Sequence, residues 1–220
     1  LKSWSIVETE NFVKLSEIFA DAQENSLVMA ICGEAGSGKS ATARAYAESN
    51  ANVAVISCNE FWNRKLFLQE VLKSLGRNPM GDTVGEMMQA VVADLKKADT
   101  PLLILDEVDK LSDQVLYFFI TLYNQLEDHC GIVLMATDHF EKKIKRGLRL
   151  NKKGYKEIYS RFGRKFITLP SVSDSDITGI CKANGIDDKG DITAIVKDSE
   201  NDLRRVRRKV FATKKRNSRR

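Results

Sequence analysis

The sequence predicts a three-layer α/β fold, with a parallel five-stranded sheet between helices and a small helical part at the C-terminus. Five short apolar runs alternate with segments whose apolar residues recur at helical spacing, and such runs are typical of buried parallel strands. After Pro170 the apolar runs cease and only helical patterns remain. We therefore expect an α/β core over residues 1–170 and a helical lid with a basic tail over residues 171–220.

The first half of the core is expected to alternate helices and strands. A helical pattern leads into an apolar run that stops at Gly33, as in a buried strand that feeds a turn. Thr83 and Glu86 have the spacing of a capping box, which indicates a helix start. The expected helices span residues 12–23, 39–48, 66–75 and 84–97, and the expected strands span residues 27–32, 52–58 and 102–105.

The second half is expected to contribute two more strands before the lid begins. Ser112 is placed to cap a long helix, and Pro170 ends the last strand. The basic stretch between these strands shows no clear element. The expected segments are a helix over residues 112–127, strands over 132–136 and 166–169, and lid helices over roughly 173–183, 191–197 and 201–213.

Composition excludes several classes of protein. A hydrophobic fraction of 43% and a charged fraction of 30% are typical of a soluble globular protein, and no apolar run approaches the ~20 residues of a membrane span. The chain begins at Leu1 without a signal-like segment, so we expect a fragment of a cytoplasmic protein. The four widely spaced cysteines are expected to be reduced core thiols, and His129 and His139 to be loop residues.

Positive charge is concentrated in two segments. Residues 141–165 contain 11 Lys/Arg against 2 acidic residues, and residues 201–220 contain 10 Lys/Arg against Asp202. Because the net charge is only +5, the rest of the chain is acidic. Such clustering favours a surface that faces a polyanion, although a solvated surface with a basic tail gives the same pattern.

A glycine-rich motif of the form G-x-x-x-x-G-K-[ST] follows the first strand and opens a helix. In this context the backbone N–H groups wrap phosphates and the helix N-terminus adds a positive end. Lys39 is expected to contact the outer phosphates, and the Ser40 hydroxyl to bind Mg²⁺. The candidate nucleotide-binding residues are Gly33, Glu34, Ala35, Gly36, Ser37, Gly38, Lys39, Ser40 and Ala41.

A second acidic motif supports this interpretation. The apolar strand of residues 102–105 is followed directly by Asp106 and Glu107. Asp106 is expected to orient the Mg²⁺ shell, and Glu107 to act as a base toward the attacking water. The alternative is a pair of exposed acids at the end of a strand.

Together these motifs resemble those of the AAA+ ATPases, and the resemblance extends over nearly the whole chain. The segment 133–138 is similar to their sensor-1 strand, with Thr137 and Asp138 as alternative γ-phosphate contacts. Ser160-Arg161-Phe162 resembles the segment that supplies an arginine finger to a neighbouring subunit, with Arg161 as first candidate and Arg164 as the second. The resemblance implies ATP and Mg²⁺ as cofactors and activity that depends on self-association.

A lid motif completes the resemblance. Asn201-Asp202-Leu203-Arg204-Arg205 is similar to the Gly-Asp-x-Arg sensor-2 segment, which makes Arg204 the expected lid contact to the γ-phosphate. Asn201 stands where the family often has glycine, which puts the start of that helix in doubt.

The nucleotide site does not define what the ATPase acts on. The segment 59–65 has aromatic residues but lacks the glycine of an unfoldase pore loop, and Phe61 and Trp62 can equally be core residues. The chain looks like the DNA-binding branch that includes replication initiators such as DnaA, helicase loaders, and the transposition regulators phage Mu B protein and TnsC. Resemblance to the last group implies a helical or ring oligomer on duplex DNA, weak sequence preference and a transposase partner.

The alternatives are a helicase loader or replication initiator of the DnaA or origin-recognition type, and a nucleotide-dependent signalling switch with a solvated tail. Asp106-Glu107 and the late Arg161 argue against a small-molecule phosphotransferase. The candidate DNA contacts are the basic residues Arg64, Lys65, Lys142, Lys143, Lys145, Arg146, Arg149, Lys152 and Lys153.

Overall fold

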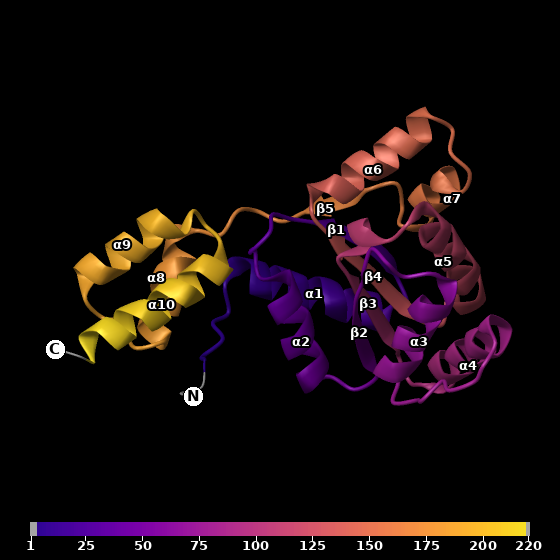
Figure 1. The fold of residues 1–220 in the computed structure, drawn as a ribbon, viewed down its shortest axis with the longest axis horizontal. Helices are drawn as coiled ribbons and strands as arrows, with labels where there is room; N and C mark the ends of the chain where they lie inside the picture. The colour runs from indigo at the N-terminus through magenta and orange to yellow at the C-terminus, as the bar shows by residue number, and fades with distance from the viewer. Residues whose placement is uncertain (1–3, 219–220) are drawn as a thin grey trace. The chain divides into compact units, whose positions relative to one another are not determined.

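The computed structural model describes residues 4–218, which form two compact units (Figure 1). Residues 1–3 and 219–220, at the ends of the predicted core and of the basic tail, lie outside the described residues. The first unit contains residues 4–15, 33–39 and 169–218, and the second contains residues 16–32 and 40–168. The division into domains 1–170 and 171–220 stays a prediction.

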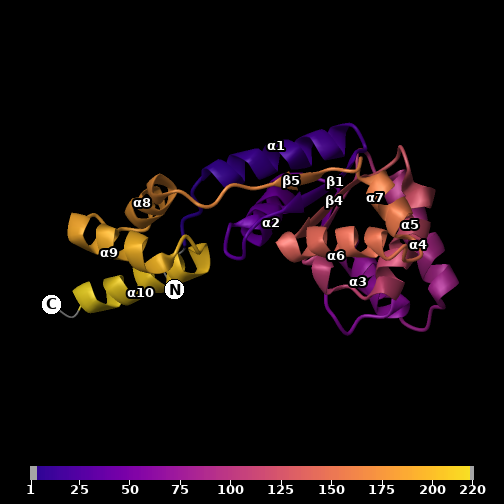
Figure 2. The same ribbon diagram turned by 90° about the horizontal axis from the view of Figure 1, so that it is seen from above.

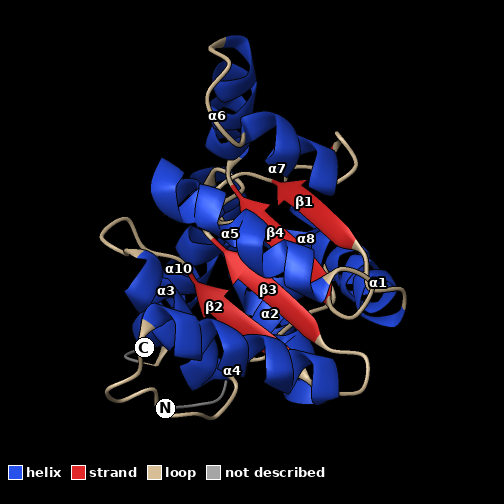
Figure 3. Ribbon diagram, turned by 90° about the vertical axis from the view of Figure 1, so that its right-hand side faces the viewer, coloured by secondary structure: helices blue, strands red, loops and turns tan. Residues whose placement is uncertain are grey.

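The second unit contains a five-stranded parallel sheet of strand order β2-β3-β4-β1-β5, which confirms the predicted fold class. In Figure 3 the arrows of β1 to β4 point to one edge of the sheet. Ser57, Asp106 and Met135 lie side by side there, so β2, β3 and β4 bring their carboxyl ends together. The strands are β1 (Val28–Cys32), β2 (Val53–Ser57), β3 (Leu102–Asp106), β4 (Gly131–Ala136) and β5 (Phe166–Thr168).

Helices cover both faces of this sheet. One face packs into a large apolar cluster with helices α3 to α7, as Ala30, Leu103 and Leu134 illustrate. Ile31 and Val133 alternate with these positions along their strands, so they face the other side of the sheet, and they are also fully buried. Phe19 of α1 and Tyr46 of α2 pack edge to face and lie outside the large cluster. The helices are α1 (Glu10–Glu24), α2 (Lys39–Ser49), α3 (Arg64–Ser74), α4 (Val84–Lys97), α5 (Asp113–Leu126), α6 (Asp138–Arg149) and α7 (Tyr155–Arg161), with a 3₁₀ turn η1 (Val108–Lys110).

The first unit is mainly a bundle of three helices, α8 (Asp174–Ala183), α9 (Lys189–Ser199) and α10 (Leu203–Asn217), grouped in Figures 1 and 2. Ile177, Val206 and Val210 are fully buried in its own apolar cluster. The N-terminal strap joins it, because the Ser5 backbone exchanges two hydrogen bonds of 3.0 Å with the Asn184 side chain.

Several predicted helix starts are confirmed. Thr83 and Glu86 form both hydrogen bonds of a capping box at α4. Ser112 and Ser173 accept backbone hydrogen bonds as the N-caps of α5 and α8. These side chains satisfy amide donors that a helix start leaves without partners.

The sequence did not predict α6 and α7. The apolar anchors of α6, Phe140 and Ile144, stand four residues apart on one helical face and are fully buried. Seven charged residues surround them within α6 and obscured the periodicity. The basic stretch is therefore a helical hairpin packed on the sheet. No helix within residues 4–218 has the length and apolarity to cross a bilayer.

Candidate nucleotide-binding site

The glycine-rich loop follows β1 and runs into α2, as the motif requires. Gly36 and Gly38 have φ angles of +79° and +97°, a backbone region that side chains other than glycine rarely adopt. Lys39 is only 8% exposed, and its Nζ donates to Gly33 O at 2.8 Å, Glu34 O at 2.9 Å and Ser37 Oγ at 3.2 Å. The ammonium group thus lies inside the concave side of its own loop.

The first residues of α10 contact this loop within the same unit. The Leu203 amide donates to Gly36 O at 2.9 Å, and a Cβ placed on Gly36 would lie 2.1 Å from Asp202 Oδ1. Asp202 caps α10 by accepting from the Arg204 amide at 2.7 Å, and the Arg204 side chain is exposed. The predicted sensor-2 segment and the phosphate loop are therefore neighbours.

Asn201 shows how the helix start accommodates the departure from glycine. Its φ angle is +59°, in the left-handed region that asparagine tolerates better than most residues. Its side-chain amide donates to Val172 O at 2.6 Å. The helix begins at Leu203 rather than at residue 201 as expected.

Asp106 and Glu107 lie at the carboxyl end of β3 in the second unit. Asp106 is 4% exposed, and its Oδ1 accepts from the Glu107 amide at 3.0 Å. Glu107 has a φ of +59° and accepts from Lys110 Nζ at 2.7 Å and Ser57 Oγ at 3.3 Å. The hydrogen bond from Lys110 to Glu107 raises the pKa of Lys110. A buried acid beside a half-exposed acid suits one metal-shell role and one proton-accepting role.

Thr137 and Asp138, the two sensor-1 candidates, have different surroundings. Thr137 follows β4 and its Oγ1 donates to Asp109 Oδ2 at 3.0 Å. Asp138 opens α6, is exposed and pairs with Lys142, whose hydrogen bond lowers the Asp138 pKa. Thr137 is held at the sheet edge, whereas Asp138 is committed to a surface ion pair.

Arg161, the first finger candidate, is held within its own unit. Its side chain is 30% exposed, pairs with Glu127 at 3.6 Å and Glu157 at 3.4 Å, and lies over the Tyr123 ring at 5.0 Å. Its Nε is buried without a hydrogen-bond partner among the described residues. Arg164 is exposed, with a φ of +58°.

Sequence comparison then places the chain in a family. A family model described as an AAA domain matches residues 22–144, more than half of the chain. This chain belongs to the AAA domain family. The match includes the glycine loop, the Asp106-Glu107 pair and Thr137.

The AAA domain also shares its fold with a solved structure of Drosophila ORC bound to DNA. The TM-score is 0.56 at 16% sequence identity, over 94% of this chain and 54% of the ORC chain. The AAA domain thus spans about half the length of that relative. No curated protein matches the sequence.

The predicted DNA contacts of the AAA domain lie in distinct settings. Arg64 lies over the Phe118 ring at 5.9 Å and Lys153 over the Tyr117 ring at 5.1 Å, while Lys65 is exposed. Phe61, which precedes Arg64 and Lys65 in the sequence, is 71% exposed and is not a core residue, whereas Trp62 packs against the core. The remaining candidates lie on or just after α6, and some of them line a pocket: Lys142, Lys143, Lys145, Arg146, Arg149 and Lys152.

Sequence reasoning missed Asn11, a fully buried polar residue of the AAA domain. Its Nδ2 donates to Pro170 O at 3.0 Å and Ser37 O at 3.4 Å, which ties α1 to the glycine loop. Asp109, Lys110 and Ser57 were missed as partners of Thr137 and Glu107. No local sequence pattern identifies these residues. The partners of Asn11 and Ser57 are distant in the sequence, and Asp109 and Lys110 belong to η1, a turn whose position depends on the folded sheet.

Proposed function

We propose that this AAA domain is an ATPase that binds duplex DNA and self-associates on it. The observation that carries the ATPase part of the proposal is the glycine loop with Lys39 turned into its concave side. Phosphate oxygens offer the same kind of acceptor as the two carbonyls and the hydroxyl that Lys39 now contacts. Gly36 and Gly38 supply the positive φ angles that such a tight loop requires, so the loop suits a nucleoside triphosphate.

The residues of the proposed site would have separate roles in binding and hydrolysing ATP. Lys39 and the amides of residues 33–41 bind the phosphates, and Ser40 with Asp106 would hold Mg²⁺, which neutralises charge on the phosphate oxygens. Glu107 accepts a proton from the attacking water, for which its carboxylate must leave Lys110. Thr137 is the better-placed sensor, since Asp138 is paired on the surface, and Arg204 contacts the γ-phosphate from α10.

Within this class we propose target selection for a transposase, with ATP-bound subunits arranged as a helix or ring along DNA in the cytoplasm. The basic residues of α3 and α6 support DNA binding through phosphates rather than bases. The second candidate is a helicase loader or replication initiator, and the shared fold with DNA-bound ORC favours this class.

The test combines ATP turnover with binding to a duplex of mixed sequence. We expect turnover to rise with DNA, and DNA affinity to require ATP and to fall steeply with salt. Glu107→Gln should bind nucleotide and DNA like the wild type but lose about 10²-fold or more in turnover. Lys39→Ala should lose nucleotide binding. ATP-independent, salt-insensitive binding would refute the DNA role.

Electron microscopy of the Glu107→Gln variant with ATP and duplex DNA distinguishes the two finer roles. Continuous filaments along DNA support target selection. Discrete particles that bind a replicative helicase support the loader or initiator.

A further inference from the structure

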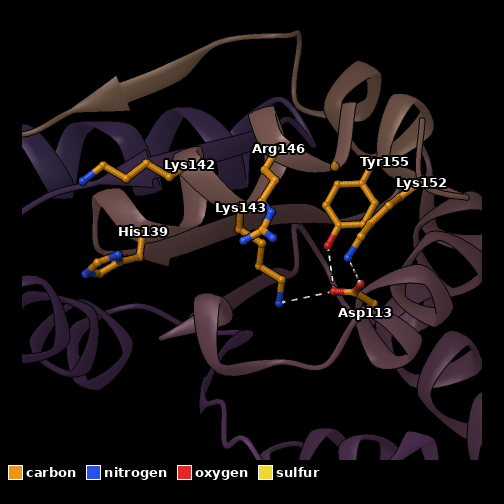
Figure 4. A pocket seen from close by; sticks show the side chains of 8 residues that line it. Asp113, His139, Lys142, Lys143, Arg146, Lys152 and Tyr155 are labelled. Atoms are coloured by element: carbon orange, nitrogen blue, oxygen red, sulfur yellow. Dashed lines mark hydrogen bonds and ion pairs between the residues drawn. The ribbon is translucent and has the colours of Figure 1, made fainter. Parts of the chain in front are cut away.

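A basic pocket lies on the hairpin of α6 and α7 in the second unit (Figure 4). Its volume is about 390 Å³. Helix α6 supplies most of its lining, and the rest comes from the start of α5 and from the turn into α7. The lining residues are Asp113, His139, Lys142, Lys143, Arg146, Gly147, Lys152 and Tyr155.

The floor of the pocket is a hydrogen-bonded network centred on Asp113. Tyr155, only 2% exposed, donates its hydroxyl to Asp113 Oδ1 at 2.7 Å, and Lys152 Nζ donates to Oδ2 at 2.8 Å. Lys143 Nζ lies 3.8 Å from the same carboxylate and donates to Leu111 O. The network fixes two cations at one end of the pocket.

Gly147 shows that the packing around this network is specific. A Cβ on Gly147 would lie 2.0 Å from Cδ1 of Tyr155, so only glycine lets the ring pass α6 and place its hydroxyl on Asp113. The pocket is thus formed by close packing of α5, α6 and α7 rather than by loose surface side chains.

The pocket carries excess positive charge. Its lining has four lysine or arginine side chains against the single carboxylate of Asp113. Burial lowers the pKa of Lys143, and the negative charge of Asp113 acts in the opposite direction and favours the ammonium form. Arg146 is exposed and points toward the pocket centre in Figure 4, and no carboxylate of residues 4–218 forms an ion pair with it.

The arrangement of these cations favours phosphates of a polymer. His139, Lys143 and Arg146 recur at intervals of three or four residues, so they line one face of α6 about one helical turn apart. Arginine suits phosphate because its planar fork donates two parallel hydrogen bonds. A DNA strand presents a regular series of such groups, whereas an acidic side chain presents one.

We propose that this pocket binds a backbone phosphate of duplex DNA, with Arg146 and Lys143 as its main cations and Asp113 as an internal counter-ion. The proposal rests on the DNA binding proposed above and specifies where that DNA is held. Asp113 keeps Lys152 and Lys143 in place but also repels the phosphate, so it limits the affinity.

The test measures duplex affinity over a series of salt concentrations with the full chain and ATP. Arg146→Gln should weaken binding by roughly 3- to 10-fold near 0.1 M salt and lower the salt slope by about one. Asp113→Asn should strengthen binding, since the amide oxygen still accepts from Tyr155 while the negative charge is gone. Lys96→Gln is the matched control, because Lys96 is exposed on α4 and should leave affinity unchanged.

Lys145→Gln separates a pocket from a merely basic helix. Lys145 lies on α6 outside the lining and pairs with Glu141, so it should cost clearly less than Arg146→Gln. Equal losses for the two variants would overturn the pocket proposal, as would wild-type affinity for Arg146→Gln.

Two further results complete the test. Wild-type protein that binds no duplex DNA would overturn the proposed function together with the pocket proposal. If Arg146→Gln loses binding to polyglutamate but not to DNA, the pocket binds an acidic protein segment, and the proposal is wrong. Nucleotide affinity serves as the check on folding, and all variants should retain it.

Discussion

Asn11 is distant from the glycine loop in the sequence but contacts it through a side-chain hydrogen bond. Its amide supplies hydrogen bonds to the carbonyls of Ser37 and Pro170, while its own Oδ1 is buried without a partner among the described residues. The side chain therefore contributes as a donor, and an acceptor in its place would face two carbonyl oxygens.

We expect Asn11→Ala to lower nucleotide affinity and to destabilise the protein by about 1–3 kcal/mol, because the buried Ser37 carbonyl and the partly buried Pro170 carbonyl lose their donor. Titration with a fluorescent ATP analogue and thermal unfolding measure the two effects. Asn25→Ala is the matched control, since Asn25 is exposed and its side-chain amide donates to Asp21, within the same turn. Equal nucleotide affinity in both variants would show that Asn11 does not shape the loop.

At the scale of elements, the Asp113 carboxylate at the start of α5 connects α6 and α7 through Lys143 and Tyr155. Hydrogen bonds from Lys152 first, and then from Tyr155, hold the pKa of Asp113 below its usual 3.8, although burial acts against them. Burial first, and then the hydrogen bond to Asp113, raises the pKa of Tyr155. The fold of the hairpin therefore favours the ionised form of Asp113 over the protonated one.

This predicts a stability change at acid pH. A carboxylate whose folded pKa is depressed stabilises the protein above its unfolded pKa and loses that contribution as pH falls through the folded value. Below about pH 3.8 the hairpin should therefore weaken, and Asp113→Asn should remove part of the loss of stability between neutral and acid pH. Chemical unfolding of both proteins over a pH series measures this. Parallel pH curves would show that Asp113 is not involved.

At the scale of the whole molecule, activity should depend on assembly. In the proposed site a neighbouring subunit would supply an arginine, and such an arginine typically contributes about 10³ to 10⁵ in rate. Arg161 is engaged by Glu127, Glu157 and Tyr123, so it must break these contacts to act in another subunit. Arg164 is exposed and can reach a neighbour without such a cost.

We expect turnover per subunit to rise with protein concentration, and Arg164→Ala to abolish that rise without changing the melting temperature. Arg161→Ala should lower the melting temperature because it removes two ion pairs and a ring contact. If Arg161→Ala instead abolishes turnover at unchanged stability, Arg161 is the finger and Arg164 is not. Equal turnover at all concentrations in wild type and both variants would exclude a trans arginine in this segment.

How far the sequence predicts the molecule depends on how local the signal is. Buried parallel strands and capping residues such as Ser112 and Thr83 are recognisable from a few neighbouring residues. The strands of the sheet and the starts of these helices could therefore be predicted. Helix α6 could not be predicted, because its two apolar anchors, Phe140 and Ile144, lie among charged residues that face the solvent. Partners such as Asn11 and Ser37, or Asp113 and Tyr155, are joined only by the completed fold.

The bond from Leu203 to Gly36, with Asp202 beside it, gives the bundle of α8 to α10 a thermodynamic role. Any ligand that binds the glycine loop in this arrangement is linked to the bundle, so each stabilises the other by the same coupling free energy. Nucleotide affinity then reports on apolar packing around Val206 and Val210, which touch no phosphate. Substitutions there would change the affinity of the glycine loop for a ligand without touching the loop.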